Sequence, residues 1–273
     1  MARRKRRAKE ASETLLAVVL GTIGILILVG LIGAYWYVKS SRPELDAETN
    51  CPKTGPRGIH VILFDRSDPI SDQQAQRIRQ AIDRYRIDAQ FGTRFDLYTF
   101  DGDTAHTLQP KLTICALGKP EEANRLIQNP ERVRQRYEAR FSSVLNQTVD
   151  DLLRTTTQPT SPIIESIRAA AISSFGPIET AQVPLKLTLI SDMVQHTKLV
   201  SQFQGDTKFP DMAASSHWIT LQPRLKGADV DILYLLRPSA LRNRAPIQNG
   251  SHQRFWEQLI AASGGRVNLI DPM

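Results

Sequence analysis

One uncharged apolar run near the N-terminus constrains this chain more than any other feature of its sequence. Residues 14–38 read TLLAVVLGTIGILILVGLIGAYWYV, which is 25 residues without a charged side chain. About 20 apolar residues in a helix suffice to cross the hydrocarbon core of a bilayer. A cleavable signal peptide has a shorter apolar part and a small-x-small cleavage site, whereas this run ends in the bulky Tyr35, Trp36 and Tyr37. The run therefore predicts an uncleaved transmembrane helix that anchors the chain in the lipid bilayer.

The positive charge of the chain lies beside this run and predicts its orientation. Residues 1–10 hold six lysine or arginine side chains and one glutamate, which is +5 of a formal net charge of +7. Basic residues next to a membrane helix stay on the cytoplasmic side and meet anionic head groups. We therefore expect residues 1–13 to be a cytoplasmic tail at the inner (plasma) membrane, with the C-terminal domain periplasmic or extracytoplasmic. Only +2 remains for residues 11–273, so the sequence favours no nucleic-acid partner.

The segment after the membrane helix is polar and carries the first of two cysteines. Residues 39–57 contain prolines and a glycine, which is typical of a stalk that leads into a domain. Cys51 and Cys115 both lie beyond the helix, on the side that we expect to be oxidising. Two cysteines allow a single intramolecular pairing. We therefore expect a Cys51–Cys115 disulfide, and two buried free thiols are the alternative.

After the stalk, short apolar runs alternate with amphipathic segments. The expected strands are residues 60–64, 94–100, 112–117, 185–190, 230–236 and 266–270. The expected helices are residues 72–86 with Ser71 as N-cap, a long helix from Asn129-Pro130 to residue 152, residues 162–174 and residues 251–262. Residues 193–227 fit neither pattern. The alternation predicts one α/β domain over residues 58–273: a three-layer, Rossmann-like, mostly parallel sheet flanked by helices, with strands 94–100 and 112–117 at an antiparallel edge.

Oxygen-bearing side chains stand where the expected strands end. Asp65 and Ser67 follow the first strand, Asp192 follows the strand 185–190, and Thr160 and Ser161 precede a helix. In parallel sheets, ligands bind in the crevice at the carboxyl ends of the strands. Carboxylates with hydroxyls and waters form a hard-oxygen site, which suits Mg²⁺ or Mn²⁺ rather than zinc. An aspartate at a strand end also serves as a turn former, so it is the coincidence of three such loops that indicates a metal site.

This arrangement resembles the von Willebrand factor A domain and its metal-ion-dependent adhesion site, over about residues 58–271. That family has Asp-x-Ser-x-Ser after an apolar strand, a threonine from a later loop and an aspartate after the central strand. The matching elements here are Asp65-Arg66-Ser67-Asp68-Pro69, Thr160 or Ser161 in TSPIIESI, and Asp192 in LTLISD. The ending FWEQLIAASGGRVNLI is also similar to that of the family. Pro69 replaces the second serine of the motif, and Met193 replaces the glycine that often follows the aspartate.

The resemblance implies a protein-binding module rather than an enzyme. In such a module an acidic side chain of a partner completes the coordination of a metal ion. Here the ion would be held by Asp65, Ser67, Ser161 and Asp192, with Thr160 as the substitute hydroxyl. We therefore expect a membrane-anchored scaffold or assembly factor that binds a protein of the cell envelope, with Mg²⁺ or Mn²⁺. The alternative is a metal-independent structural subunit with a decayed site. A metal-dependent hydrolase that uses Asp65 is disfavoured, because the sequence has no nucleophile elbow, no phosphate-binding loop and no obvious general base.

Overall fold

The protein divides into two compact units, Met1–Glu44 and Leu45–Met273, and each is described by itself. The structure, a computed structural model, describes residues 2–40, 43–100, 108–124, 128–154, 159–176, 183–204, 208–237 and 247–273. Within the first range, the side chains of residues 18–37 are described.

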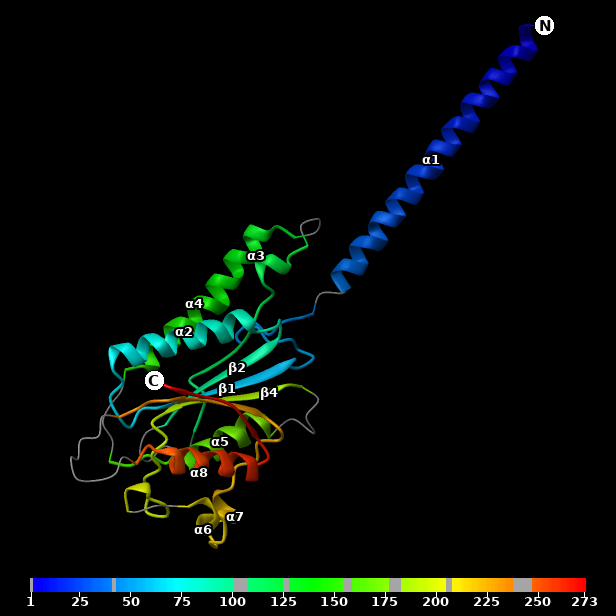
Figure 1. Cartoon of the computed structure of the whole chain (residues 1–273). Helices are drawn as coiled ribbons and strands as arrows, with labels where there is room; N and C mark the ends of the chain where they lie inside the picture. Colours follow the sequence, from blue (N-terminus) through cyan, green and yellow to red (C-terminus); the bar gives the residue numbers. More distant parts are fainter. Residues whose placement is uncertain are drawn as a thin grey trace. The chain divides into compact units, whose positions relative to one another are not determined.

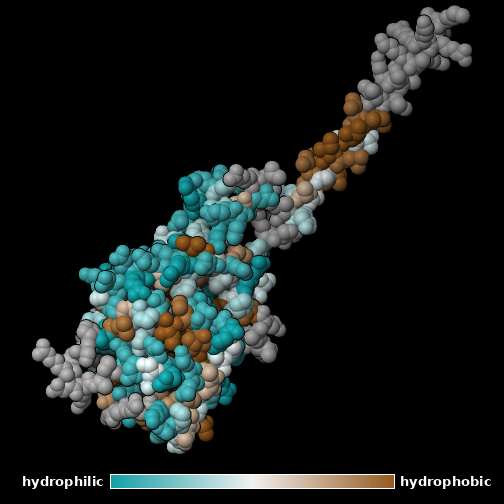
Figure 2. Space-filling model, viewed as in Figure 1, coloured by the Kyte–Doolittle hydropathy of each residue, from teal (hydrophilic) through white to brown (hydrophobic). Residues whose placement is uncertain are grey.

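The first unit is one continuous helix, α1 (Ala2–Ser40). Its stretch Val18–Tyr37 is long and apolar enough to cross a membrane, with a mean hydropathy of 2.4. The side chains of this stretch are exposed, and Figure 2 shows them as a brown band along the helix. A helix of this length with apolar side chains on all sides is suited to lipid on all sides. The structure thus agrees with a membrane anchor, whereas the orientation across the membrane stays a prediction.

Six strands form one sheet in the order β3-β2-β1-β4-β5-β6. Their bounds are β1 (Gly58–Asp65), β2 (Thr93–Phe100), β3 (Leu112–Cys115), β4 (Leu185–Ser191), β5 (Asp229–Tyr234) and β6 (Arg266–Pro272). Neighbouring strands are parallel except β3, which runs antiparallel to β2 at the edge. The central strand β1 is buried along its whole length, as its continuous apolar sequence predicts for a strand covered on both faces.

Helices cover both faces of the sheet (Figure 1). On one face lie α2 (Asp72–Asp88), α3 (Pro130–Tyr137) and α4 (Ser143–Leu152); on the other lie α5 (Ile163–Phe175) and α8 (Gly250–Ala262). Two apolar cores result, because alternate residues of β1 point to opposite faces: Ile62 packs with the α2 face, and Val61 and Leu63 pack with the α5 face. The three-layer, mostly parallel α/β fold expected from the sequence is confirmed.

The stretch 193–227, which the sequence left unassigned, contains short helical pieces on the α5 side. They are a 3₁₀ turn, η4 (Gln202–Gln204), and two helices, α6 (Phe209–Ala213) and α7 (Trp218–Leu221). Another 3₁₀ turn, η2 (Pro120–Glu122), follows β3. Met212 and Leu221 bring α6 and α7 into the α5-side core. Pieces of three to five residues are too short to show a helical period, which explains why the sequence pattern did not locate them.

The long helix predicted from Asn129 onward contains one wide turn. A π-helical turn, η3 (Glu138–Ser142), joins α3 to α4. The buried side chains Tyr137, Phe141, Leu145 and Val149 recur every four residues. Such a repeat drifts around a regular helix of 3.6 residues per turn, and the wider turn keeps these side chains on one side.

Two helix starts are those predicted, and a third is shifted. Ser71 caps α2 in a capping box, and the side chain of Asn129 caps α3. α5 begins one residue later than expected, because Pro162 is its N-cap residue and Ile163 its first helical residue. Ser161 therefore stands in extended chain before the helix, where it forms a β-bridge.

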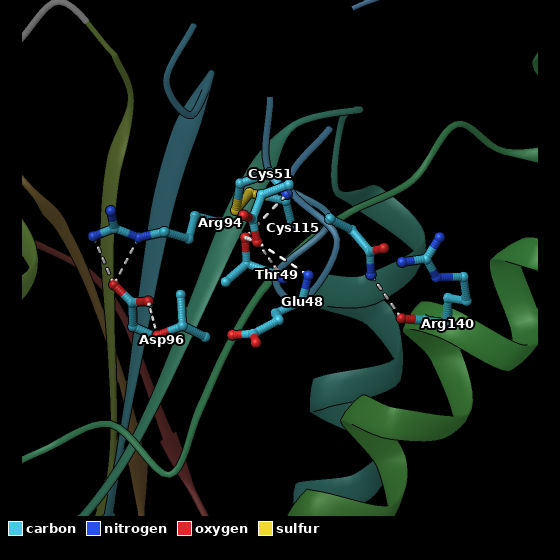
Figure 3. The surroundings of a disulfide bond; sticks show 10 residues. Glu48, Thr49, Cys51, Arg94, Asp96, Cys115 and Arg140 are labelled. Atoms are coloured by element: carbon cyan, nitrogen blue, oxygen red, sulfur yellow. Dashed lines mark hydrogen bonds and ion pairs between the residues drawn. A yellow bond between two sulfur atoms is a disulfide. The ribbon is translucent and has the colours of Figure 1, made fainter. Parts of the chain in front are cut away.

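Residues 45–57 belong to the folded domain, so the stalk predicted over residues 39–57 is shorter than expected. Cys51 and Cys115 form a disulfide that fixes this segment to the end of β3 (Figure 3). The backbone N–H of Cys115 also donates to the carbonyl of Thr49 at 2.7 Å. The predicted disulfide is confirmed. The stalk was misjudged because prolines and glycine also form tight turns inside a domain, and composition does not separate the two cases.

Removing the disulfide is expected to lower the free energy of unfolding by about 4 kcal/mol. A cross-link between residues 64 apart in sequence restricts the unfolded chain strongly. The measurement is denaturant unfolding of the full-length chain in detergent, comparing the wild type with the double variant Cys51→Ser/Cys115→Ser. The wild type treated with a reductant is the control and should lose as much; a loss below about 1 kcal/mol in both would contradict the prediction.

His60 is a buried histidine beneath α2. Its Nε2 lies 2.8 Å from Oγ1 of Thr188, and its ring contacts those of Tyr85 and Phe95. Burial, with a smaller effect of the charge of Lys186, lowers the pKa of His60 from 6.5 to about 3. The imidazole is therefore neutral in the folded protein at neutral pH.

We expect this histidine to make the domain less stable in acid. The unfolded chain takes up a proton near pH 6.5 and the folded one near pH 3, so stability is lost as the pH falls between these values. Free energies of unfolding at several pH values across this window test the prediction. His60→Gln should weaken the pH dependence. A variant that loses stability with falling pH as steeply as the wild type would show the prediction to be wrong.

Candidate functional site at the carboxyl edge of the sheet

Asp65, the last residue of β1, is the centre of the predicted site and is 3% exposed. Its Oδ1 accepts hydrogen bonds from the backbone N and from Oγ of Ser67, at 2.9 and 2.5 Å. Its Oδ2 accepts from Oγ of Ser161 at 3.2 Å and from Oγ of Ser191 at 2.7 Å. Four donors from three segments of the chain therefore hold one buried carboxylate. We call the ends of β1, β4 and β5, with the loops that follow them, the carboxyl edge.

Asp192 follows β4 at the same edge and is 5% exposed. Its Oδ1 accepts from the backbone N of Val194 at 2.9 Å, and its Oδ2 lies 3.3 Å from Nε of Arg237. Arg237 follows β5, and a second nitrogen of its guanidinium donates to the backbone carbonyl of Pro69. One arginine thus links the loops after β1, β4 and β5.

Burial raises the pKa of both carboxyl groups. For Asp65, loss of water outweighs the hydrogen bonds from the three serines, which lower the pKa. For Asp192, burial first and the charge of Asp65 second raise the pKa to about 7, against the N–H of Val194 and the guanidinium of Arg237. Two buried acids beside one arginine leave an excess of negative charge at this edge, which a proton or a further cation relieves.

The chain turns sharply after Asp192. Met193 has a φ of 61°, in the left-handed region that favours glycine. Its N–H donates to Oγ of Ser191 at 2.7 Å, and its carbonyl accepts from Nε1 of Trp256 at 2.8 Å. The resemblance places a glycine at this position, so the methionine adopts the conformation that a glycine adopts without strain. Its fully buried side chain and these two hydrogen bonds hold it there.

The loop that contains Ser161 is fixed to the segment after Asp192. Ser161 and His196 pair through both of their backbone groups, at 2.9 Å each. Oε1 of Gln195 accepts from the N–H of Ile164 at 3.0 Å, which satisfies the first turn of α5. The sequence left open whether Thr160 or Ser161 provides the loop hydroxyl. Among the described residues it is Ser161 that contacts Asp65, and Thr160 is half-buried beside it.

The structure brings four of the five predicted ligands together. Asp65, Ser67 and Ser161 share hydrogen bonds, and Asp192 lies close enough for its charge to act on that of Asp65. Most of the loop 155–161, which ends in Thr160 and Ser161, lies outside the described residues.

Sequence reasoning missed Ser191, Arg237 and Gln248. Ser191 is the buried last residue of β4, where a hydroxyl at the end of an apolar strand was the available signal. Arg237 directly follows the expected strand 230–236, but the rule that identified Asp65 and Asp192 considered oxygen-bearing side chains and so passed over an arginine. Gln248 has no such signal, because its role depends on chain that is distant in sequence: its Nε2 donates to the carbonyls of Asp192 and Leu235, at 2.9 Å each.

The oxygen atoms of the predicted ligands, as they are arranged, do not fit a divalent metal ion. Mg²⁺ needs about six oxygen ligands in octahedral geometry. All four acceptor positions of Asp65 already receive N–H or O–H groups, and Asp192 faces a guanidinium. A metal ion at this edge would find few free ligands. They are the hydroxyl oxygens of Ser67 and Ser161 and the remaining lone pairs of Asp192. The Mg²⁺ or Mn²⁺ expected from the sequence stays a prediction.

Comparison with known proteins finds similar solved structures but no matching protein family. No protein-family model matches it, and no curated protein matches it. Among solved structures it is similar to an aerotolerance-related membrane protein from Bacteroides fragilis, solved with multiple mutations to serine (13% identity, TM-score 0.36, 79% of this chain and 90% of that one). It is also similar to BatB, a conserved hypothetical protein from Bacteroides thetaiotaomicron (15%, 0.39, 79% and 91%), and to proximal thread matrix protein 1 of the mussel byssus (12%, 0.37, 66% and 38%). Likeness at this level carries no argument about function.

Asp65→Asn is expected to lower the free energy of unfolding by about 2 kcal/mol, because an amide NH₂ would face hydroxyls that now donate to an oxygen. The matched control is Asp68→Asn, a half-buried aspartate of the same loop, which should change stability little. Denaturant unfolding of both variants is the measurement. Similar losses in the two would mean that Asp65 does not organise this edge.

Proposed function

We propose that this membrane-associated protein binds a protein partner through the carboxyl edge of its sheet. The observation that carries the proposal is the exposure of large apolar side chains there. Leu199, Phe203 and Leu236 are 52%, 55% and 46% exposed. They stand in the segments that follow β4 and β5, the same segments that hold Asp192 and Arg237. Apolar side chains around a small polar cluster are typical of a surface that another protein covers.

The chemistry of the edge favours binding over catalysis. A nucleophile or general base must reach its substrate, whereas the carboxylates of Asp65 and Asp192 are buried and hydrogen-bonded. In the described part of the chain, a groove of about 430 Å³ lies beside α5 and α7; Leu199 is among its lining residues, and neither Asp65 nor Asp192 is. These features support a non-enzymatic module over the hydrolase that the sequence left as an alternative.

We further propose that the domain is extracytoplasmic and acts as a scaffold or assembly factor in a complex of the cell envelope. Two features support this orientation. The basic residues 1–10 directly precede the apolar part of α1, and such residues stay in the cytoplasm. The Cys51–Cys115 disulfide needs an oxidising compartment to persist. The sequence left two forms of the module open, one with Mg²⁺ or Mn²⁺ and one without metal, and the arrangement of Asp65 and Asp192 supports the second.

Site-specific photocrosslinking in the native membrane tests the proposal. A photoreactive residue at Leu199 or Leu236 of the full-length chain is expected to give a discrete adduct with another envelope protein. The matched control is Ile87, which is 56% exposed and also apolar, and which lies near the end of α2, away from the carboxyl edge. We expect no adduct from this position. Equal adducts from all three positions, or none from Leu199 and Leu236, would refute the proposal.

A further inference from the structure

The side chain of Arg237 is held in place from both of its ends. Its backbone N–H donates to Oε1 of Gln248 at 2.7 Å, and the amide nitrogen of Gln248 donates to the carbonyls of Asp192 and Leu235. Gln248 therefore fixes the base of the arginine and the backbone of its acidic partner at once. The guanidinium then reaches Asp192 and Pro69 with its side chain only 26% exposed. A charge positioned in this way is part of the fold rather than a mobile surface group.

The guanidinium joins the loops that a metal ion would join at such an edge. It contacts a carboxylate oxygen of Asp192 after β4 and a carbonyl oxygen of Pro69 in the loop after β1. Pro69 stands where the resembling motif has its second serine. The hydroxyl oxygen of that serine is absent here, and the carbonyl oxygen of Pro69 faces the guanidinium of Arg237 instead. A guanidinium keeps its charge at any ordinary pH and offers several N–H donors in a rigid plane.

The two buried carboxylates explain why the positive charge of Arg237 stabilises this edge. Asp65 and Asp192 are both buried, and a buried carboxylate without compensation is costly. Arg237 offsets part of this negative charge without any ion from solution. A divalent ion at the same place would meet the repulsion of the guanidinium, because like charges in a partly buried site are poorly screened.

We propose that Arg237 is the built-in cation of the carboxyl edge, so that this edge is held together, and binds its partner, without a metal ion. That Arg237 holds the edge together follows from its contacts. That the edge binds its partner without metal rests on the function proposed above.

Variants of the full-length chain that remove single charges, studied in detergent, test whether Arg237 holds the edge together. Arg237→Gln is expected to lower the midpoint of thermal unfolding by about 5 °C, because Asp192 is left without its counter-ion. The matched control is Arg266→Gln, which removes an arginine–aspartate pair of 2.6 Å whose side chains are 78% and 43% exposed, and which should shift the midpoint little. The double variant Asp192→Asn/Arg237→Gln should recover at least half of the loss, because neither charge is then left alone. A loss of packing around Arg237 would show no such recovery.

Metal addition completes the test. The midpoint of the wild type should be the same in excess Mg²⁺ or Mn²⁺ as in chelator. The inference is overturned if metal raises the wild-type midpoint and Asp192→Asn abolishes the rise. It is also overturned if Arg237→Gln loses no more than Arg266→Gln, or if the double variant shows no recovery.

The photocrosslinks separate this inference from the proposed function. Adducts from Leu199 that persist in chelator support both. Adducts that chelator abolishes leave the proposed function standing and overturn the metal-free edge. Absence of adducts in every condition contradicts the proposed function, and the thermal measurements then decide the role of Arg237 alone.

Discussion

The buried carboxylate of Asp65 is the interaction on which the arrangement of the carboxyl edge depends. A charged group is tolerated in such a position only when its oxygens are fully hydrogen-bonded, since leaving the bonds unmade costs far more than the bonds gain. Ser67, Ser161 and Ser191 meet that requirement, and each belongs to a different segment of the chain. The loops are therefore positioned by the needs of one carboxylate. The exposed apolar side chains around them are carried on loops that the polar cluster has already fixed.

The departures from the resembling motif make physical sense together. Pro69 has lost a hydroxyl, and its carbonyl accepts from Arg237 instead. Met193 keeps a left-handed backbone at a cost, and its burial against Trp256 offsets that cost. The first change leaves the loop after β1 joined to Asp192 through the side chain of Arg237. The second keeps the sharp turn that follows Asp192.

The sequence was sufficient for most of the fold because the central strand is buried on both faces and two of the helices carry strong start signals. The continuous apolar run in β1, the capping box at Ser71 and the Asn-Pro start of α3 are all local features. Asp65 and Asp192 followed from a rule about strand ends. The features that the sequence did not predict depend on contacts between residues far apart in the chain. Arg237 and Pro69 are separated by 168 positions, and residues 45–57 become part of the domain through a bond to Cys115. The π-helical turn was hidden because a four-residue repeat is nearly helical in sequence.

The order of the strands has a kinetic consequence. β1 pairs with β4 across a long stretch of chain, and Ser191 and Asp65 are 126 positions apart. Contacts between such distant segments form late, because the entropy of closing the intervening loop is lost before they stabilise anything. The surface at the carboxyl edge is therefore complete only once β1, β4 and β5 have paired. A partner that recognises this edge would select finished molecules over nascent ones, so assembly and quality control would be one event.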